Sequence, residues 1–422
     1  MTSCTRYLPL VALVLVSSLA SGSPRAIAER TAELINNNFY DAARAQQIAD
    51  ELGAATRSGA FDTLQDPRDL ASALTQRLHK FDRHFNVTWS GGVPAAQRSP
   101  SMSFEAMDRR SGYGFRRVEI LPGAIGLIDM RTFADFRFGK PDEPARKAVD
   151  AALALMSGAD AVILDLRNNG GGSPAMVGYV VSAFTPADAN IYNEFHRRDG
   201  HDSERPDETY AKPMLKMPLF VLISGRTASA AEATAYTLQA AKRATIVGET
   251  SAGAANPGGP FPIGEGFNIF ISTGTPINAV TGKNWEGVGV KPDVPVDNER
   301  ALLRAQILAL EKVLAADIDR TESQENQWIL EALRVQNGAP PDGPPLTDYA
   351  GTYSGAKITV QTGTLVFRRG ERPAVALMRI KGDTFFVTDE PFRRVLFERG
   401  SSGKVTGFQL VRNGGDALWF RK

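Results

Sequence analysis

Cysteine is almost absent from this chain of 422 residues. The only one, Cys4, lies near the N-terminus. For the rest of the chain this excludes disulfides, a thiol nucleophile and a zinc site built from cysteine. The folded parts must therefore be stabilised by packed apolar cores.

An excess of charge of one sign is also missing. Lys and Arg number 48, Asp and Glu number 47, and the formal net charge is +1. This balance gives no electrostatic argument for nucleic acid or for an anionic membrane as a partner. Histidine is scarce, with four residues in the whole chain. Any reaction that needs an imidazole base must use one of those four.

A long apolar run occurs only at the N-terminus, where Arg6 precedes YLPLVALVLVSSLASG. The run is short for a membrane span and ends in small residues, which is typical of a secretory signal peptide. We expect residues 1–22 to be that signal, with cleavage before Ser23. Cleavage after Ala28 and an uncleaved anchor are the alternatives. Export to the periplasm or the cell exterior follows, without stable membrane insertion after cleavage.

The pattern of apolar and polar residues divides the remaining chain into several parts. Residues 23–110 are expected to form an N-terminal helical domain and a linker, because apolar residues recur there at helical spacing. Strands alternate with helices over residues 111–300, which predicts a parallel α/β core. Two amphipathic helices are expected in 301–336 and a linker at 337–345. Short strand-like runs in 346–422 predict a small antiparallel β domain, with a barrel as one possible form.

Two junctions between a buried strand and a helix have unusual sequences. After AVILDL comes RNNGGGSP (167–174, the glycine loop), where Gly171 and Gly172 let backbone N–H groups approach an anion or a developing oxyanion. After PLFVLIS comes SGRTASAAE, with Ser229 at the start of a helix, where the helix dipole favours negative charge. Both junctions also have plain structural explanations. These are a glycine turn, and a capping box formed by Ser229 and Glu232.

Four segments in this order resemble the catalytic domain of the tail-specific (C-terminal processing) protease superfamily: AVILDLRNNGGG, LISGRTASAAEATAYTLQ, IVGETSAGAANPGG and NWEGVGVKPDVPV. With VEILPGAIGLIDM before them, the resemblance covers about residues 115–300. The expected fold is α/β, and the resemblance implies a crotonase/Clp-protease-like ββα core. This core would lie between an N-terminal helical domain and a C-terminal antiparallel β domain. The resemblance also implies that Ser229 is the nucleophile of a serine-type peptidase.

Branches of this superfamily differ in the base that activates the serine. Bacterial tail-specific proteases use a lysine from the segment that reads TSAGAAN here, where Ala254 stands. Lys242 is too close to the serine in sequence to replace it. The chain instead resembles the tricorn core and interphotoreceptor retinoid-binding protein-like branch, which uses Ser, His and Glu. That resemblance assigns the base to His84, in FDRHFNV, and the orienting acid to Glu286, in NWEGVGVKPD.

Other candidates for these roles are weaker. His79 falls among charged residues of a predicted helix, and His196 and His201 fall in a polar segment, so we expect all three to be solvated. Glu232 is a rival acid, but one helical turn from the serine it is expected to support the helix start. A structural histidine and a surface carboxylate are the alternative interpretations of the proposed base and acid.

The chemistry implied by the resemblance is acyl transfer. The oxyanion would be held by the backbone N–H groups of Ala230 and of Gly171 or Gly172. The expected partner is a peptide or protein substrate, no metal or organic cofactor is implied, and the oligomeric state is left open. A PDZ module is not expected, since the loop-like stretch 88–114 is too short for one. A hydrophobic-ligand-binding protein on the same scaffold and an esterase are the alternative functions.

Overall fold

The fold is known from a computed structural model, which describes residues 22–91, 103–316, 320–338, 341–413, 415 and 417–422. The expected signal peptide therefore lies outside the described residues, except for its last residue. The chain forms two compact units. Unit 1 contains the residues up to 99 together with 258–274, and unit 2 contains 100–257 and 275–422.

Unit 1 packs three helices against a three-stranded antiparallel sheet. The helices are α1 (Pro24–Asn38), α2 (Ala42–Arg57) and α3 (Pro67–Leu78), and the strands are β1 (Asn86–Trp89), β9 (Gly258–Gly264) and β10 (Phe267–Ser272), in the order β1-β10-β9. Ile269 and Ile271 of β10 are fully buried with apolar residues of the helices. The segment GFNIFIS, expected to continue the α/β core, thus contributes to the core of the N-terminal helices.

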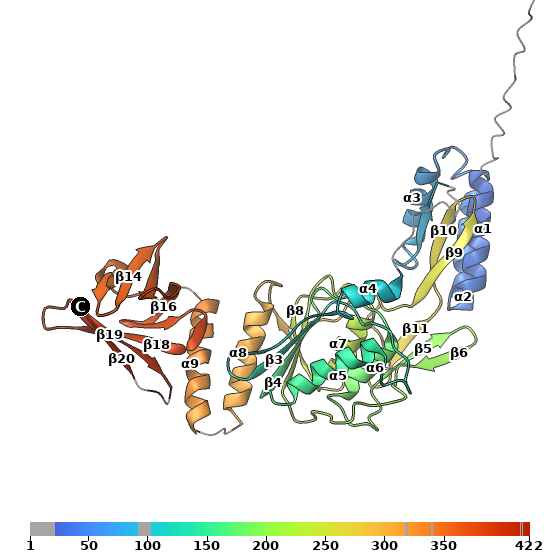
Figure 1. The fold of residues 1–422 in the computed structure, drawn as a ribbon. Coiled ribbons are helices and arrows are strands. Elements are labelled where there is room, and N and C mark those ends of the chain that lie inside the picture. The colour runs from blue at the N-terminus through green and yellow to red at the C-terminus, as the bar shows by residue number, and fades with distance from the viewer. Residues whose placement is uncertain (1–21, 92–102, 317–319, 339–340, 414, 416) are drawn as a thin grey trace, which may run out of the picture. The chain divides into compact units, whose positions relative to one another are not determined.

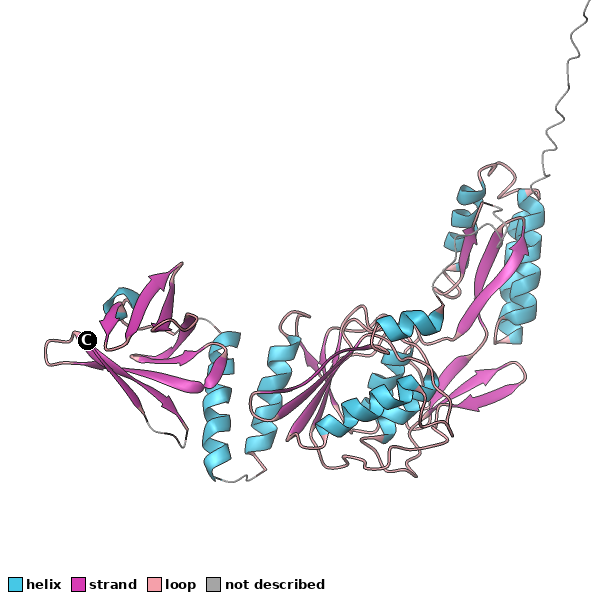
Figure 2. Cartoon of the chain, in the orientation of Figure 1, coloured by secondary structure: helices cyan, strands magenta, loops and turns pink. Residues whose placement is uncertain are grey.

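Unit 2 is built on a six-stranded sheet (Figures 1 and 2). Its order is β12-β8-β7-β4-β3-β2, with the strands β2 (Phe115–Leu121), β3 (Ile125–Met130), β4 (Ala161–Asp165), β7 (Leu219–Ile223), β8 (Thr245–Gly248) and β12 (Val294–Pro295). Only the pairing of β2 with β3 is antiparallel within this sheet as described. Every residue of β4 and β7 is buried, as parallel strands covered on both faces require.

Helices cover both faces of this sheet. Alternate residues of β4 point to opposite faces: Val162 and Leu164 share a core with α5 (Pro144–Met156), α6 (Pro174–Ser182) and α7 (Ala230–Ala240). Ile163 shares the other core with α8 (Ala301–Leu314) and α9 (Arg320–Asn337). The predicted α/β class is confirmed. No helix in the described part of the chain is long and apolar enough to cross a membrane.

Two segments expected to be irregular have regular structure. Within the loop-like stretch 88–114 lies α4 (Phe104–Arg110), whose start is capped by Ser103, since its side chain accepts the N–H of Ala106 at 3.2 Å. The polar segment that holds His196 and His201 forms the hairpin of β5 (Asn193–Arg197) and β6 (Gly200–Ser203), which pairs with β11 (Thr275–Asn278). The helix and the hairpin are short and rich in polar residues, so their sequences show no clear helical or alternating pattern of apolar residues.

The C-terminal β domain is an eight-stranded antiparallel meander with its strands in chain order. It comprises β13 (Gly351–Tyr353), β14 (Ala356–Gln361), β15 (Thr364–Arg369), β16 (Val375–Lys381), β17 (Thr384–Val387), β18 (Glu390–Arg399), β19 (Val405–Arg412) and β20 (Leu418–Arg421). The N–H of Ser354 donates to the carbonyl of Arg421 at 2.8 Å, and the N–H of Arg421 to Ser354 Oγ at 2.9 Å. These bonds bring the first and last strands together into a nearly closed barrel.

Candidate active site

Ser229 and the glycine loop are brought together by neighbouring parallel strands. Because β4 and β7 pair directly, the loops that follow them leave the same edge of the sheet side by side. Three hydrogen bonds join the two loops: Thr227 Oγ1 to the carbonyl of Leu166 (2.8 Å), Ser224 Oγ to the carbonyl of Arg167 (2.5 Å) and the N–H of Ala228 to the carbonyl of Asn169 (3.0 Å). The two sequence motifs therefore form one site.

Ser229 adopts a backbone conformation that is rare for a residue with a side chain. Its φ is +55° and its ψ is −123°, at the position before the first residue of α7. A strained backbone of this kind costs about 1–3 kcal/mol and persists only where the surroundings impose it. The residue is exposed, so the tight strand-to-helix turn presents its hydroxyl at the surface of unit 2, as a nucleophile requires.

Gly171 packs directly against Ser229. A Cβ atom on Gly171, whose φ is +111°, would lie 2.8 Å from the Cβ of Ser229 and 3.1 Å from the nitrogen of Ala230. The N–H of Gly171 donates to Asn169 Oδ1 at 2.9 Å. Within the described residues, the N–H groups of Gly172 and Ala230 have no protein acceptor. Of the three predicted oxyanion donors, these two are therefore the ones left for a ligand.

Glu232 holds the loop that follows β8 against the start of α7. The residue is fully buried, and its carboxylate accepts four hydrogen bonds, from the N–H of Ser229 (2.9 Å), Ser251 Oγ (2.5 Å), the N–H of Gly253 (2.6 Å) and the N–H of Ala254 (2.8 Å). With both oxygens occupied, Glu232 supports the helix start, as expected. Its bond to the N–H of Ser229 also holds the backbone of that residue.

Glu286 is anchored to the same loop. Its Oε2 accepts the N–H groups of Ala255 (2.9 Å) and Asn256 (3.0 Å). The neighbouring Trp285 is 1% exposed and packs against Tyr236 of α7, with ring centroids 5.1 Å apart. A continuous set of hydrogen bonds thus runs within unit 2 from Ser229 through Glu232 and the loop 251–256 to Glu286.

His84 lies in unit 1, in the turn between α3 and β1. Its Nδ1 lies 2.9 Å from Asp82 Oδ1, and its backbone N–H donates to the same oxygen at 2.8 Å. The other oxygen of Asp82 accepts Ser272 Oγ at 2.8 Å. Burial alone would raise the pKa of Asp82, but the hydrogen bonds from His84 and Ser272 outweigh it and hold that pKa below its ordinary value of 3.8.

An ionised Asp82 fixes the tautomer of His84. A carboxylate only accepts hydrogen bonds, so the bond to Asp82 assigns a ring proton to Nδ1 of His84. Sequence reasoning placed Asp82 in the FDRHFNV segment but gave it no role, and it missed Ser272 altogether. The D-x-H spacing was the available signal for Asp82, whereas nothing in the sequence joins Ser272 to it.

The other histidines that the sequence offers are all exposed, and the lysine candidate lies at the wrong end of its helix. His79 is the exposed C-cap of α3, and His196 and His201 are exposed partners across the β5–β6 hairpin. Lys242 follows the C-terminal end of α7, whereas Ser229 precedes its N-terminal end. At ~1.5 Å per residue the eleven residues of this helix separate them by about 16 Å. A Ser–Lys pair of these two residues is therefore excluded.

Comparison with known proteins finds a family match for the region that contains these loops. Residues 124–296 match Peptidase family S41. The resemblance to the tail-specific protease superfamily is thereby confirmed for this part of the chain. The S41 match contains the glycine loop, Ser229 and Glu286, while His84 lies before it. The narrower assignment to the tricorn-like branch stays a prediction.

Two curated relatives are named as C-terminal processing proteases. A carboxy-terminal-processing protease of Bartonella bacilliformis (strain ATCC 35685 / KC583 / Herrer 020/F12,63) is 30% identical over 186 residues, which are 43% of this chain and 40% of that protein. A carboxyl-terminal-processing protease of Synechocystis sp. (strain ATCC 27184 / PCC 6803 / Kazusa) is 32% identical over 160 residues, 37% of this chain and 36% of that protein. The chain therefore matches less than half the length of either relative.

One solved structure shares the fold over a larger part of the chain. It comes from Parabacteroides merdae ATCC 43184 and is provisionally described as a peptidase. Its TM-score is 0.51 at 16% identity, and the match covers 71% of this chain and 100% of that one. At this identity the likeness concerns the fold alone.

Proposed function

We propose that this protein is an exported serine peptidase that cleaves peptide bonds through an acyl-enzyme intermediate on Ser229. The observation that carries the proposal is the geometry of Ser229. It is an exposed serine with φ of +55° at the start of α7, flanked by Gly171 and lying inside the S41-matching region. Two backbone N–H groups next to it are unoccupied in the described structure.

In the first half of the reaction, Ser229 Oγ attacks the carbonyl carbon of the scissile peptide bond. The hydroxyl proton passes to Nε2 of His84, and the carbonyl oxygen becomes an oxyanion. The N–H groups of Ala230 and Gly172 would stabilise that charge. When the C–N bond breaks, the imidazolium returns its proton to the leaving amine, and the acyl group remains on the serine. In the second half, water attacks the acyl carbon and gives a proton to His84. The imidazolium returns that proton to Ser229 Oγ as the ester bond breaks and the carboxylic acid product leaves.

Two carboxylates support the base in this proposal. Asp82 holds Nδ1 of His84 and stabilises the imidazolium that forms. Glu286 is the acid assigned by the resemblance, and the backbone N–H groups of Ala255 and Asn256 hold its side chain in place. The reaction requires the His84 imidazole to come within hydrogen-bond reach of Ser229 during proton transfer.

The substrate is proposed to be a peptide or protein, because the S41 relatives are named as processing proteases. Export rests on the apolar run before residue 22 and its small-residue boundary. The proposed location is periplasmic or extracellular. The only cysteine, Cys4, precedes the apolar run, so the part of the chain proposed to be exported contains none.

The proposal is tested by labelling the purified protein with a fluorophosphonate probe and mapping the labelled residue by mass spectrometry. We expect labelling at Ser229, none in Ser229→Ala, and a rate about 10²–10⁴-fold lower in His84→Ala, the range of general acid–base catalysis. His79→Ala is the matched control, because His79 is exposed in the same unit, and it should label like the native protein.

The outcomes separate the parts of the proposal. Labelling that persists in His84→Ala would keep the nucleophile and discard the base. No labelling of the folded native protein would overturn the peptidase proposal in favour of a binding protein. Cleavage of small acyl esters without any cleavage of peptides would identify an esterase instead.

A further inference from the structure

The C-terminal barrel has arginines at both of its ends, on the faces of the strands that point inward. On β15 the buried Leu365 and Phe367 alternate with less buried residues, and Arg369 continues their face. On β19 the buried Phe408 and Leu410 are continued by Arg412 in the same way. The opposite end holds Arg379 and Arg399.

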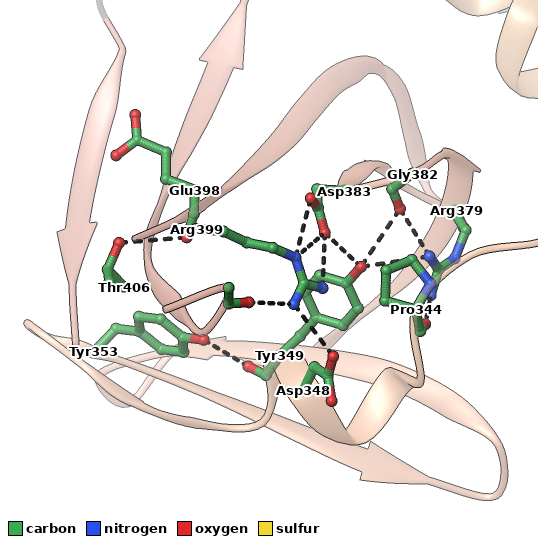
Figure 3. Close-up of polar contacts among 11 residues, drawn as sticks. Pro344, Asp348, Tyr349, Tyr353, Arg379, Gly382, Asp383, Glu398, Arg399 and Thr406 are labelled. Carbon is green, nitrogen blue, oxygen red and sulfur yellow. Dashed lines mark hydrogen bonds and ion pairs between the residues drawn. The ribbon is translucent and has the colours of Figure 1, made fainter. Parts of the chain in front are cut away.

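At that opposite end, oxygen atoms contact both arginines, and both guanidinium groups lie over the ring of Tyr349 (Figure 3). Tyr349, from the 3₁₀ turn Leu346–Tyr349, is fully buried and donates to Asp383 Oδ1 at 2.7 Å. Arg399 Nε donates to the same carboxylate at 3.0 Å. Arg379 donates to the carbonyls of Gly382 (2.7 Å) and Pro344 (2.5 Å). This end of the barrel is closed by its own residues.

The end with Arg369 and Arg412 is open. It holds a cavity of about 290 Å³, whose wall includes Phe367, Val387 and Leu410 from the barrel core. This volume lies near the lower end of the range for small-molecule sites, roughly 300–1,000 Å³. The wall therefore offers apolar contact to a short ligand.

Among the described residues, the lining of this cavity carries more positive than negative charge. Four arginines and one glutamate line it, and Glu390 pairs with Arg393 at 3.0 Å. In the described part of the chain, Arg369, Arg372 and Arg412 have no carboxylate partner. Aromatic rings hold two of them in place: Arg369 lies over Phe420 (5.8 Å) and Arg412 over Phe392 (5.2 Å). Guanidinium groups held this way are arranged for two-pronged bonds to a carboxylate.

We propose that the open end of the barrel binds a carboxylate carried on a short apolar body. The apolar part enters between Phe367, Val387 and Leu410, and the carboxylate pairs with Arg369 and Arg412. A C-terminal peptide residue and a short fatty acid share this chemistry. The site is independent of the chemistry at Ser229, because all of its residues come from the C-terminal barrel.

Calorimetric titration of the full chain tests the proposal, with octanoate, octylamine and octanol as probes of equal length and different charge. Octanoate is expected to bind, while octylamine and octanol bind at least about tenfold more weakly, equivalent to ~1.4 kcal/mol. Arg369→Gln and Arg412→Gln should each weaken octanoate binding to a similar degree. Arg368→Gln is the matched control, because Arg368 is the outward-facing neighbour on β15 and pairs with Glu371.

A second pair of probes distinguishes the two sources of the carboxylate. N-acetyl-leucyl-leucine and its C-terminal amide are titrated into the Ser229→Ala protein, so that no cleavage can occur. Tighter binding of the free acid than of octanoate would support a peptide C-terminus as the ligand, and the reverse order would support a fatty acid. The proposal is overturned if no carboxylate binds, if octylamine binds as well as octanoate, or if Arg412→Gln, at an exposed position, leaves binding unchanged.

Discussion

At the scale of a single residue, the site depends on Gly171 having no side chain. Ser229 packs into the space that a side chain at this position would fill. In Gly171→Ala the new Cβ would meet Ser229 Cβ at 2.8 Å in a backbone region with φ of +111°. We expect the variant to fold with a displaced serine and to lose most of its reactivity toward a fluorophosphonate. Labelling rate and thermal midpoint, measured together, check this.

Gly170→Ala is the control for that substitution. No atom lies within 4 Å of a Cβ at Gly170, and its φ is not in the left-handed region. Both the labelling rate and the thermal midpoint should therefore match the native values. Equal losses in both variants would mean that the loop, rather than the contact with Ser229, limits reactivity.

Isosteric substitutions can distinguish the contributions of Asp82 and Glu286 to the proposed reaction. In Asp82→Asn the amide can present an N–H to Nδ1 of His84 and so favour the wrong tautomer, which should lower kcat/KM by about 10²–10⁴-fold. Glu286→Gln keeps an acceptor for Ala255 and Asn256 but removes the charge. Peptide hydrolysis by both variants, with unfolding midpoints as a check, is the measurement. Full activity in Glu286→Gln would remove Glu286 from the proposed triad.

The sequence predicts residues well where the chemistry is local. The contact of Gly171 with Ser229 follows from two motifs at the ends of neighbouring strands, and the supporting role of Glu232 follows from a capping-box spacing. The hydrogen bond of Ser272 to Asp82 spans 190 positions, and no periodicity or spacing indicates it. Local patterns determine which residues a turn exposes, but not which distant hydroxyl completes a network.

At the scale of elements, the β5–β6 hairpin is anchored by a buried carboxyl group. Glu204, the residue after β6, is 3% exposed, and Asn193 Nδ2 donates to it at 2.6 Å. Burial raises the pKa of Glu204 from 4.5 to about 8, although the hydrogen bonds of Asn193 oppose the shift. Near neutral pH this group is therefore protonated in the folded protein.

This shift predicts how stability depends on pH. Between about pH 4.5 and 8 the folded protein keeps a proton that the unfolded chain releases, so stability falls as the pH rises, by at most ~1.4 kcal/mol per unit. Glu204→Gln resembles the protonated form and removes this dependence. Its thermal midpoint should exceed that of the native protein by an amount that grows from pH 5 to pH 8. Parallel midpoint curves, or the same gain in the exposed Glu194→Gln control, would contradict this.

The sequence predicted which segments form helices and strands better than it predicted which of these elements pack together. The continuous apolar runs of β4 and β7 and the helical spacing of apolar residues in α8 and α9 are strong signals, and the structure contains all four elements. The pattern of β10 is equally clear, but alternation shows only that one face of a strand is buried and not which helices bury it. The sequence therefore did not show that β10 packs with α1 to α3.

At the scale of the whole molecule, unit 1 depends on a segment far along the chain. Ile269→Ala removes apolar volume from a fully buried position in its core, which should cost about 2–5 kcal/mol. We expect hydrogen exchange in α1, α2 and α3 to accelerate more than in α5, α6 and α7. Ile246→Ala, at a fully buried position in unit 2, should give the opposite pattern. Equal acceleration everywhere would show that the two units unfold as one.

The hydrogen bond between Ser272 and Asp82 has a consequence for the order in which the protein is made. A ribosome synthesises His84 and Asp82 early, Ser229 later, and β10 with Ser272 later still. Until β10 is available, β1 lacks its partner strand and Asp82 lacks the hydrogen bond from Ser272. The nascent chain thus carries its serine for some forty residues of synthesis before the turn that orients the histidine can be completed. In the proposed mechanism, a chain synthesised only as far as Ser229 would hold its nucleophile without the complete support of its base.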